Sequence, residues 1–171
     1  MDQVLDGLAP YFLHVSYVVR DIEAAIESFK RLMGVKHFGL IQIPMATPLQ
    51  MRGKPVTETF NLKLSVGRTG PTGDTEIELI QPVPVGNDIY SEFLKTAGPG
   101  MHHIAFLVPN WEKATRELRA AGVPRLLESE NGEFHFAYFD LRSAVGSVIE
   151  VVQYDQQAYE MIESLKGPKG L

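Results

Sequence analysis

The chain has 171 residues, of which 44% are hydrophobic and 22% are charged, a composition typical of a soluble globular protein. Its formal net charge is −5 and its Lys and Arg residues form no cluster, so nucleic acid is not expected as a partner. Cysteine is absent, which excludes disulfides and thiolate metal sites and leaves nitrogen and oxygen as metal ligands. The N-terminus "MDQVLDGLAPYFL" has neither a basic start nor a long apolar run, so we expect no signal peptide, no membrane span and a cytoplasmic protein.

The first predicted elements are a strand and a helix within "LHVSYVVRDIEAAIESFKRLMGV" (13–35). Asp21 suits the N-cap of this helix and Gly34 suits its C′ position. Apolar residues recur between them at helical spacing, which indicates a face packed on the core. The segment 43–56 follows, and its prolines predict an extended, irregular path that could cover a hydrophobic substrate or form a dimer contact.

Two further strands, at 60–66 and 76–82, are predicted to end the first half, and the linker "TAGPG" (96–100) follows. The next segment, "HHIAFLVPNWEKATRELRAAGV" (102–123), then repeats the first strand and helix. Alternation at 133–141 predicts another strand. The last strand, "VIEVVQY" (148–154), resembles "EIELIQP" of the first half.

The repeat predicts the fold. We expect an α+β protein in which two paired βαβββ modules form a curved, open-barrel-like mixed sheet with helices outside. The chain would be a single two-module domain, 1–171, with module one at about 11–95 and module two at about 100–154. A C-terminal helix is expected at about 155–166.

Aligning the halves also identifies four residues that could share one site. A His begins the first strand of each module, and a Glu lies within the last strand of each. If the modules pair symmetrically, these side chains meet near the pseudo-twofold axis: His14, Glu78, His103 and Glu150. Two imidazoles and two carboxylates suit a divalent ion such as Zn, Ni, Co, Mn or Fe(II), and we expect one ion per chain.

The same residues also have a purely structural interpretation. A single Glu between apolar strand residues most often faces solvent, and a single His at the start of a strand is usually structural. Here, however, the two His occupy equivalent positions of the repeat, and so do the two Glu, which favours the metal site. In the doublet His102-His103, alternation along the strand makes only one residue a ligand. His103 overlays His14 and is the candidate, whereas His102 should point the other way and serve in packing or in a hydrogen bond that supports a ligand.

Four stretches carry a family resemblance: "LHVSYVVRDIEAAIESF", "IELIQP", "GPGMHHIAFLV" and "VIEVVQ". With the paired modules, they make the chain resemble the vicinal oxygen chelate superfamily, which includes glyoxalase I, methylmalonyl-CoA epimerase, bleomycin-binding proteins and extradiol dioxygenases. The glyoxalase- and epimerase-like branch is the most similar. The resemblance implies a homodimer and assigns metal binding to the four aligned residues named above.

The resemblance further implies a metal-dependent lyase or isomerase. Its substrate would be a small carbonyl, 2-oxo or acyl-thioester compound, converted through a metal-stabilised enolate. Glu150 is the first candidate for the acid-base residue and Glu78 the second.

Two alternatives remain open. A ring-cleaving dioxygenase would use two His and one carboxylate on Fe(II), and a fourth protein ligand would crowd out oxygen. A non-catalytic, bleomycin-resistance-like protein would bind an aromatic ligand, and such family members typically lack the metal residues.

Overall fold

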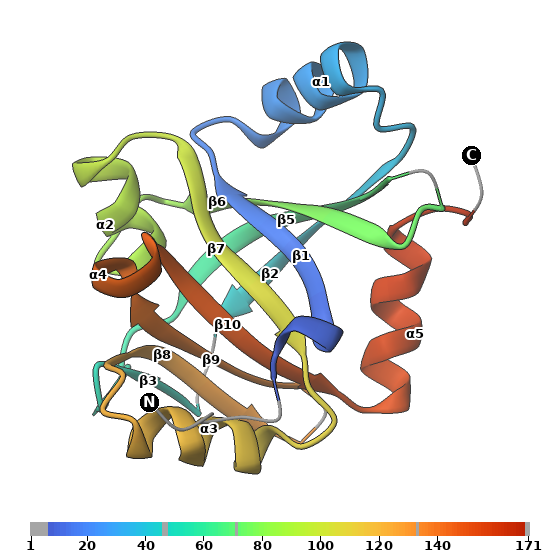
Figure 1. Cartoon of the computed structure of the whole chain (residues 1–171). Helices are drawn as coiled ribbons and strands as arrows, with labels where there is room; N and C mark the ends of the chain where they lie inside the picture. The colour runs from blue at the N-terminus through green and yellow to red at the C-terminus, as the bar shows by residue number, and fades with distance from the viewer. Residues whose placement is uncertain (1–6, 46–47, 71, 133, 170–171) are drawn as a thin grey trace.

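The computed structural model describes residues 7–45, 48–70, 72–132 and 134–169 (Figure 1). Its strands form one sheet in the order β2-β5-β6-β1-β7-β10-β9-β8-β3-β4. Their bounds are β1 (Phe12–Val18), β2 (Phe38–Met45), β3 (Leu49–Met51), β4 (Lys54–Pro55), β5 (Phe60–Thr69), β6 (Thr75–Val83), β7 (Gly100–Leu107), β8 (Arg125–Asn131), β9 (Phe134–Leu141) and β10 (Ser147–Tyr154).

The helices are η1 (Ala9–Tyr11), α1 (Ile22–Met33), α2 (Ile89–Thr96), α3 (Trp111–Ala120), α4 (Arg142–Val145) and α5 (Gln156–Leu165). Within the described ranges, none of them combines the length and the apolar character that crossing a bilayer requires. Helix α2 was not predicted, although Asp88 caps it by accepting hydrogen bonds from the backbone N–H groups of Tyr90 and Ser91.

The sheet has the predicted pseudo-twofold arrangement. β1 and β7 pair antiparallel at its centre, β6 lies parallel to β1, and β10 lies parallel to β7. β5 and β2 continue the sheet on one side, and β9 and β8 continue it on the other. The predicted α+β fold with two paired modules in a curled mixed sheet is therefore confirmed.

Helices α1 and α3 cover the outer face of the sheet, as expected. The α1 residues Ile22 and Ile26 pack on Leu79 of β6, while Trp111 and Leu118 of α3 pack on β9 and β10. A third and larger apolar cluster fills the inside of the curl. In Figure 1, α1 and α3 lie at opposite ends of the molecule.

The two modules use equivalent residues to begin these helices. Asp21 and Asn110 each accept a hydrogen bond from a backbone N–H in the first turn, which confirms the predicted N-cap at Asp21 and shows its counterpart in module two. The repeated glutamines also play equivalent roles, because Gln81 accepts from the N–H of Ile22 and Gln153 accepts from the N–H of Trp111. Each last strand therefore holds the start of its module's helix.

The strand pairing of β1 with β7 contains two irregularities at equivalent positions. Between Ser16 and Tyr17 of β1, the partner changes from His103 to Met101, so that His102 is an extra residue in β7. Leu13 of β1 is the corresponding extra residue opposite Phe106 and Ala105. Such β-bulges interrupt the alternation of side chains along a strand.

Residues 48–56, the later part of the proline-containing segment, are more regular than its prolines suggested. β3 pairs with β8 of module two and β4 pairs with β3, so this segment extends the far edge of the sheet. Leu49, within this segment, is only 3% exposed and belongs to the inner core. Pairing with a strand about 80 residues later supplies the backbone hydrogen bonds that the local sequence does not reveal.

Candidate metal centre and cavity

The structure brings the four aligned side chains together on the inner face of the curl. His14 lies on β1, Glu78 on β6, His103 on β7 and Glu150 on β10. The sequence neighbours of each glutamate, such as Leu79 and Val151, face the outer helices. Because side chains alternate along a strand, both glutamates face inward.

The distances among these groups follow the twofold symmetry of the modules. Nε2 of His14 lies 3.4 Å from Oε2 of Glu78 and 3.6 Å from Oε2 of Glu150. Nε2 of His103 lies 3.4 Å from Oε2 of Glu150 and 3.6 Å from Oε2 of Glu78. Each module's histidine is therefore nearest to the glutamate of its own module.

The buried atoms at this centre lack hydrogen-bond partners. Nε2 of His14, Nε2 of His103 and Oε2 of Glu78 are all buried and make no hydrogen bond, although they lie at ion-pair distances from one another. Such atoms are costly unless something binds them. Ligand atoms around one tetrahedral zinc ion lie roughly 3.4 Å apart, since each bond is about 2.1 Å long.

The fit to a divalent ion therefore rests on donor chemistry and spacing. Ligand atoms of His14, Glu78 and His103 all lie within 4.8 Å of one another. Glu150 is outside that group of three, but its Oε2 is as close to the two imidazoles as that of Glu78. We regard all four residues as candidates to hold an ion.

The imidazoles and carboxylates of the centre shift one another's pKa values toward the charged forms. Burial by itself lowers the pKa of His14, but the carboxylates of Glu78 and Glu150 outweigh burial and raise it. Burial raises the pKa of Glu78, whereas the attraction to His14 and His103 together outweighs burial and holds that pKa well below its ordinary value. The carboxylate of Glu78 is therefore ionised and able to bind a cation.

His102 belongs to the same cluster, which corrects the expectation that it points away from the site. The bulge turns its ring inward, where it packs against Tyr90, Phe93 and Tyr138. Its Nδ1 lies 3.0 Å from Nδ1 of His103, so a hydrogen bond that supports a candidate ligand is present, as expected.

The direction of that hydrogen bond follows from the role of His103. If Nε2 of His103 binds a cation, its Nδ1 carries the proton and donates it to His102. Burial lowers the pKa of His102 to about 3, and the neighbouring His103 adds to the effect. His102 is therefore neutral and able to accept.

Two tyrosines cover the same end of the site. The hydroxyl of Tyr90 donates to that of Tyr138 at 3.0 Å, and the ring of Tyr138 packs against His103 with centroids 4.9 Å apart. Burial raises the pKa of both phenols, and the nearby carboxylate of Glu150 raises them further. Both tyrosines therefore remain neutral hydrogen-bonding groups.

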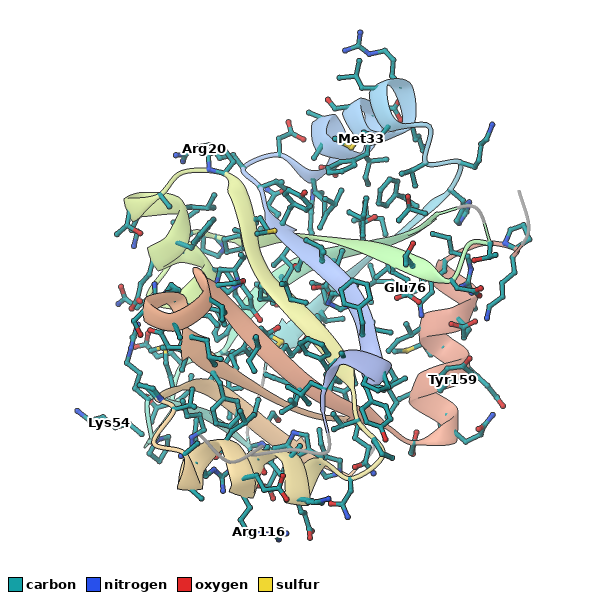
Figure 2. The ribbon with its side chains drawn as sticks, in the orientation of Figure 1. Arg20, Met33, Lys54, Glu76, Arg116 and Tyr159 are labelled. Carbon is teal, nitrogen blue, oxygen red and sulfur yellow. The ribbon has the colours of Figure 1, made fainter. Side chains whose placement is uncertain are left out.

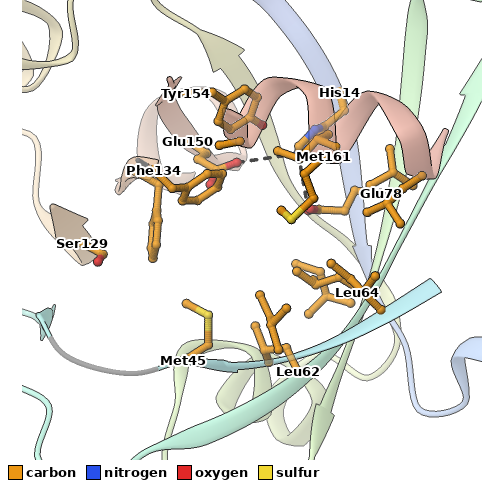
Figure 3. Close-up of a pocket in the computed structure, with 18 of the residues that line it drawn as sticks. His14, Met45, Leu62, Leu64, Glu78, Ser129, Phe134, Glu150, Tyr154 and Met161 are labelled. Carbon is orange, nitrogen blue, oxygen red and sulfur yellow. Dashed lines mark ion pairs between the residues drawn. The ribbon is translucent and has the colours of Figure 1, made fainter. Parts of the chain in front are cut away.

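A cavity of about 440 Å³ opens from the centre (Figure 3). His14, Glu78 and Glu150 lie at one end of it, with Met45, Leu62 and Leu64 across from them. Phe134, Phe136 and Tyr138, which alternate along β9, also line it. This volume is in the range of sites that bind small organic molecules, roughly 300–1,000 Å³.

Sequence reasoning did not place the C-terminal helix at this cavity. α5 lies at residues 156–165, as predicted, and its apolar face forms one wall through Ala158, Met161, Ile162 and Leu165. The spacing of these residues indicates a buried helical face, but not what it packs against. Tyr90, on the unpredicted α2, is another lining residue that sequence reasoning missed.

Comparison with known proteins agrees with this geometry. The family model of the glyoxalase/bleomycin resistance protein/dioxygenase superfamily matches residues 13–139, which include the bulged strands and three of the four clustered residues. The chain belongs to this superfamily. The resemblance to vicinal oxygen chelate proteins is thereby confirmed.

One named relative is an epimerase. Human mitochondrial methylmalonyl-CoA epimerase is 30% identical over 115 residues, which are 67% of this chain and 56% of that protein. The chain thus matches little more than half the length of this relative.

Solved structures show the same fold. Methylmalonyl-CoA epimerase from Mycobacterium tuberculosis has a TM-score of 0.60 at 20% identity, covering 93% of this chain and 97% of that chain. The Streptomyces coelicolor enzyme, solved as a variant with 2-nitronate-propionyl-CoA, has a TM-score of 0.58 at 18% identity. The match covers 92% of this chain and 98% of that chain. A hypothetical protein from Bacillus halodurans reaches 0.59 at 21% identity, covering 86% and 96%.

Proposed function

We propose that this chain is an isomerase of the epimerase type, which removes and returns the proton on the carbon beside a carbonyl or thioester group. The observation that carries the proposal is the placement of two buried carboxylates beside two imidazoles at the end of an apolar cavity. The human relative, named an epimerase, supports the reaction class.

The donor set fits one divalent ion per chain, held by two imidazole nitrogens and two carboxylate oxygens from His14, Glu78, His103 and Glu150. When bound, such an ion supplies Lewis acidity that stabilises an enolate oxygen. His102 keeps the ring of His103 in the tautomer and orientation that leave its Nε2 free to bind.

The glutamates move the proton in this proposal. An enolate has two faces, and reprotonation on the opposite face requires an acid on each side. Glu78 and Glu150 come from opposite sides of the pseudo-twofold axis, and each lies within 3.6 Å of both imidazoles. Glu150 remains the first candidate for the base, with Glu78 as its counterpart.

The rest of the site excludes water and competing charge. Tyr90 and Tyr138 close the end beside His103 as neutral groups, and apolar side chains line most of the remaining cavity. Exclusion of water strengthens the electrostatic interactions among the groups that remain in the site.

One alternative has support from the structure. The size and apolar lining of the cavity also suit a protein that binds an aromatic ligand without chemistry. The buried ligand atoms that make no hydrogen bond favour an enzyme, since a simple binding protein has no need for them.

Solvent exchange tests the proposal. Metal-loaded protein is incubated in D₂O with 2-oxo acids and with acyl thioesters, and deuterium at the α-carbon is followed by NMR. We expect catalysed exchange, and a loss of roughly 10²–10⁴-fold in rate for Glu150→Gln and for Glu78→Gln, the range typical of general acid–base groups. Glu58→Gln, at an exposed position outside the cavity lining, is the matched control and should exchange as the wild type does. A metal-loaded chain that exchanges none of these compounds contradicts the proposed function.

A further inference from the structure

The walls of the cavity carry very little positive charge. None of the described residues that line it is Lys or Arg, whereas three are glutamates: Glu76, Glu78 and Glu150. Glu78 and Glu150 together carry the charge that one divalent ion would neutralise. Glu76 has a partner of its own, because Nζ of Lys166 lies 2.6 Å from its carboxylate.

Two cations beside Glu76, Lys166 and Arg68, both have partners already. Lys166, only 2% exposed, also contacts Glu163 at 2.9 Å. The guanidinium of Arg68 bonds Glu163 at 2.7 Å and the carbonyls of Gly73 and Gly167. Figure 2 shows Glu76 beside the C-terminal end of α5, where this network lies. Two glutamates balance two cations, so the network has no free cation for a substrate carboxylate.

The shape of the cavity points to a bulky hydrocarbon group. Phe134 stacks on Tyr154 with ring centroids 5.0 Å apart and an interplanar angle of 18°, and both rings line the cavity. Met161 and Ile162 of α5 and Leu62 of β5 add further apolar side chains to its walls. In Figure 3 Met161 and Phe134 lie on the cavity beside Glu150. A methyl group would leave most of the 440 Å³ unfilled.

We propose that this cavity binds an uncharged, aryl-sized hydrocarbon substituent on the reacting carbon of the substrate. The substrate class is therefore carbonyl or thioester compounds with an aryl or similarly bulky apolar group at the α-carbon. This inference rests on the proposed function and specifies its substrate. A carboxylate on the same substituent would be desolvated without a partner, which is costly, whereas an aromatic ring gains the full hydrophobic transfer.

The test uses three ligands that share one chelating group and differ only in the substituent. Acetohydroxamate, phenylacetohydroxamate and malonic acid monohydroxamate are titrated into the zinc-loaded chain by calorimetry. We expect the phenyl compound to bind at least tenfold more tightly than the methyl compound, and the carboxylate compound to bind no more tightly than the methyl compound. A smaller phenyl preference, or a preference for the carboxylate, overturns the inference.

Two variants of α5 locate the binding site. Met161→Arg places a cation on the cavity wall, and its side chain is 54% exposed, so we expect the fold to tolerate the change. It should remove the phenyl preference, so that phenylacetohydroxamate binds no more tightly than acetohydroxamate. Ser164→Arg adds the same charge at an exposed α5 position outside the cavity lining and should leave all three affinities unchanged. If Met161→Arg retains the phenyl preference, the apolar group binds elsewhere and the inference fails.

The calorimetric titration and the deuterium-exchange experiment together distinguish a failure of this inference from a failure of the proposed function. A phenyl preference in a chain that exchanges no α-proton contradicts the reaction and leaves the apolar site standing. Exchange without a phenyl preference contradicts the substrate class and leaves the reaction standing.

Discussion

At the scale of single residues, one extra residue in β7 decides the surroundings of the site. Without the bulge, alternation would turn His102 toward the outer helices. With it, His102 reaches the Nδ1 of His103 and stays buried among Tyr90, Phe93 and Tyr138. The equivalent bulge in β1 carries Leu13, so module one lacks this imidazole acceptor at the matching position.

The hydrogen bond between the histidines gives a prediction at this scale. His102→Phe preserves the aromatic packing but removes the acceptor for the Nδ1 proton of His103. We expect the affinity for Zn²⁺ to fall roughly 10–100-fold, as is typical when the hydrogen-bond partner of a ligand is lost. Competition with a fluorescent chelator measures it.

His135→Phe is the matched control, because His135 is half-buried beside Trp111 and lies outside the ion-binding group. It should bind zinc as tightly as the wild type. Unchanged zinc affinity in His102→Phe would show that the contact between the two imidazoles does not orient a ligand.

At the scale of elements, α5 forms a wall whose position depends on a buried ion network. Lys166 follows the last turn of the helix and bonds Glu76 on β6, 90 residues earlier in the chain. The polypeptide of β2 comes so close to α5 that a Cβ on Gly39 would lie 2.2 Å from the carbonyl oxygen of Leu165. Only glycine allows the helix to pack this tightly at that point.

The Lys166–Glu76 pair gives the prediction for this element. Lys166→Met leaves a buried carboxylate without its partner, so we expect unfolding free energy to fall by about 3–5 kcal/mol. The double variant Lys166→Met with Glu76→Gln removes both charges and should recover a large part of that loss. Urea unfolding of the single and double variants measures the coupling.

Lys169→Met is the control for this series, because Lys169 pairs with Asp74 across 3.7 Å at an exposed position. Its effect should stay within about 0.5 kcal/mol, as for most surface substitutions. Strictly additive losses in the double variant would show that Lys166 and Glu76 do not stabilise each other.

At the scale of the whole molecule, the candidate ion site joins the two modules. Each module contributes one His and one Glu, and their strands meet along the β1–β7 seam at the centre of the sheet. A bound ion would therefore crosslink the two halves of the sheet. Its binding free energy would add directly to the stability of the folded chain.

Metal removal tests this link. Zinc at roughly 100 times its dissociation constant should stabilise the chain by about 2.7 kcal/mol. For a domain of this size, that corresponds to a rise in Tm of about 5–10 °C. Scanning calorimetry of chelator-treated and zinc-loaded protein measures the shift.

His103→Ala supplies the internal control, because it removes one module's imidazole from the site. Zinc should raise its Tm by no more than a degree or two. His37→Ala, at an exposed position outside the cluster, should keep the full shift. A full shift in His103→Ala would place the stabilising ion somewhere else in the molecule.

The sequence alone was sufficient to predict the repeat, the paired modules, α5 and the four clustered residues. These depend on local patterns. Side chains alternate along a strand, so Glu78 and Glu150 face the inside of the sheet when their sequence neighbours face the helices. Asp21 and Asn110 mark the starts of helices because their side chains cap the first turn. Equivalent positions in a symmetric repeat then meet near its axis, so a one-dimensional alignment contains three-dimensional information.

Only the tertiary structure decided which way His102 turns, where segment 43–56 pairs and what α5 covers. A bulge is a mismatch between two strands, so neither strand records it alone. β3 obtains its hydrogen bonds from β8, and Lys166 obtains its partner from β6, both far away in the chain. The apolar cavity, and with it the proposed substrate class, arises from these long-range contacts, because its walls come from both modules and from α5.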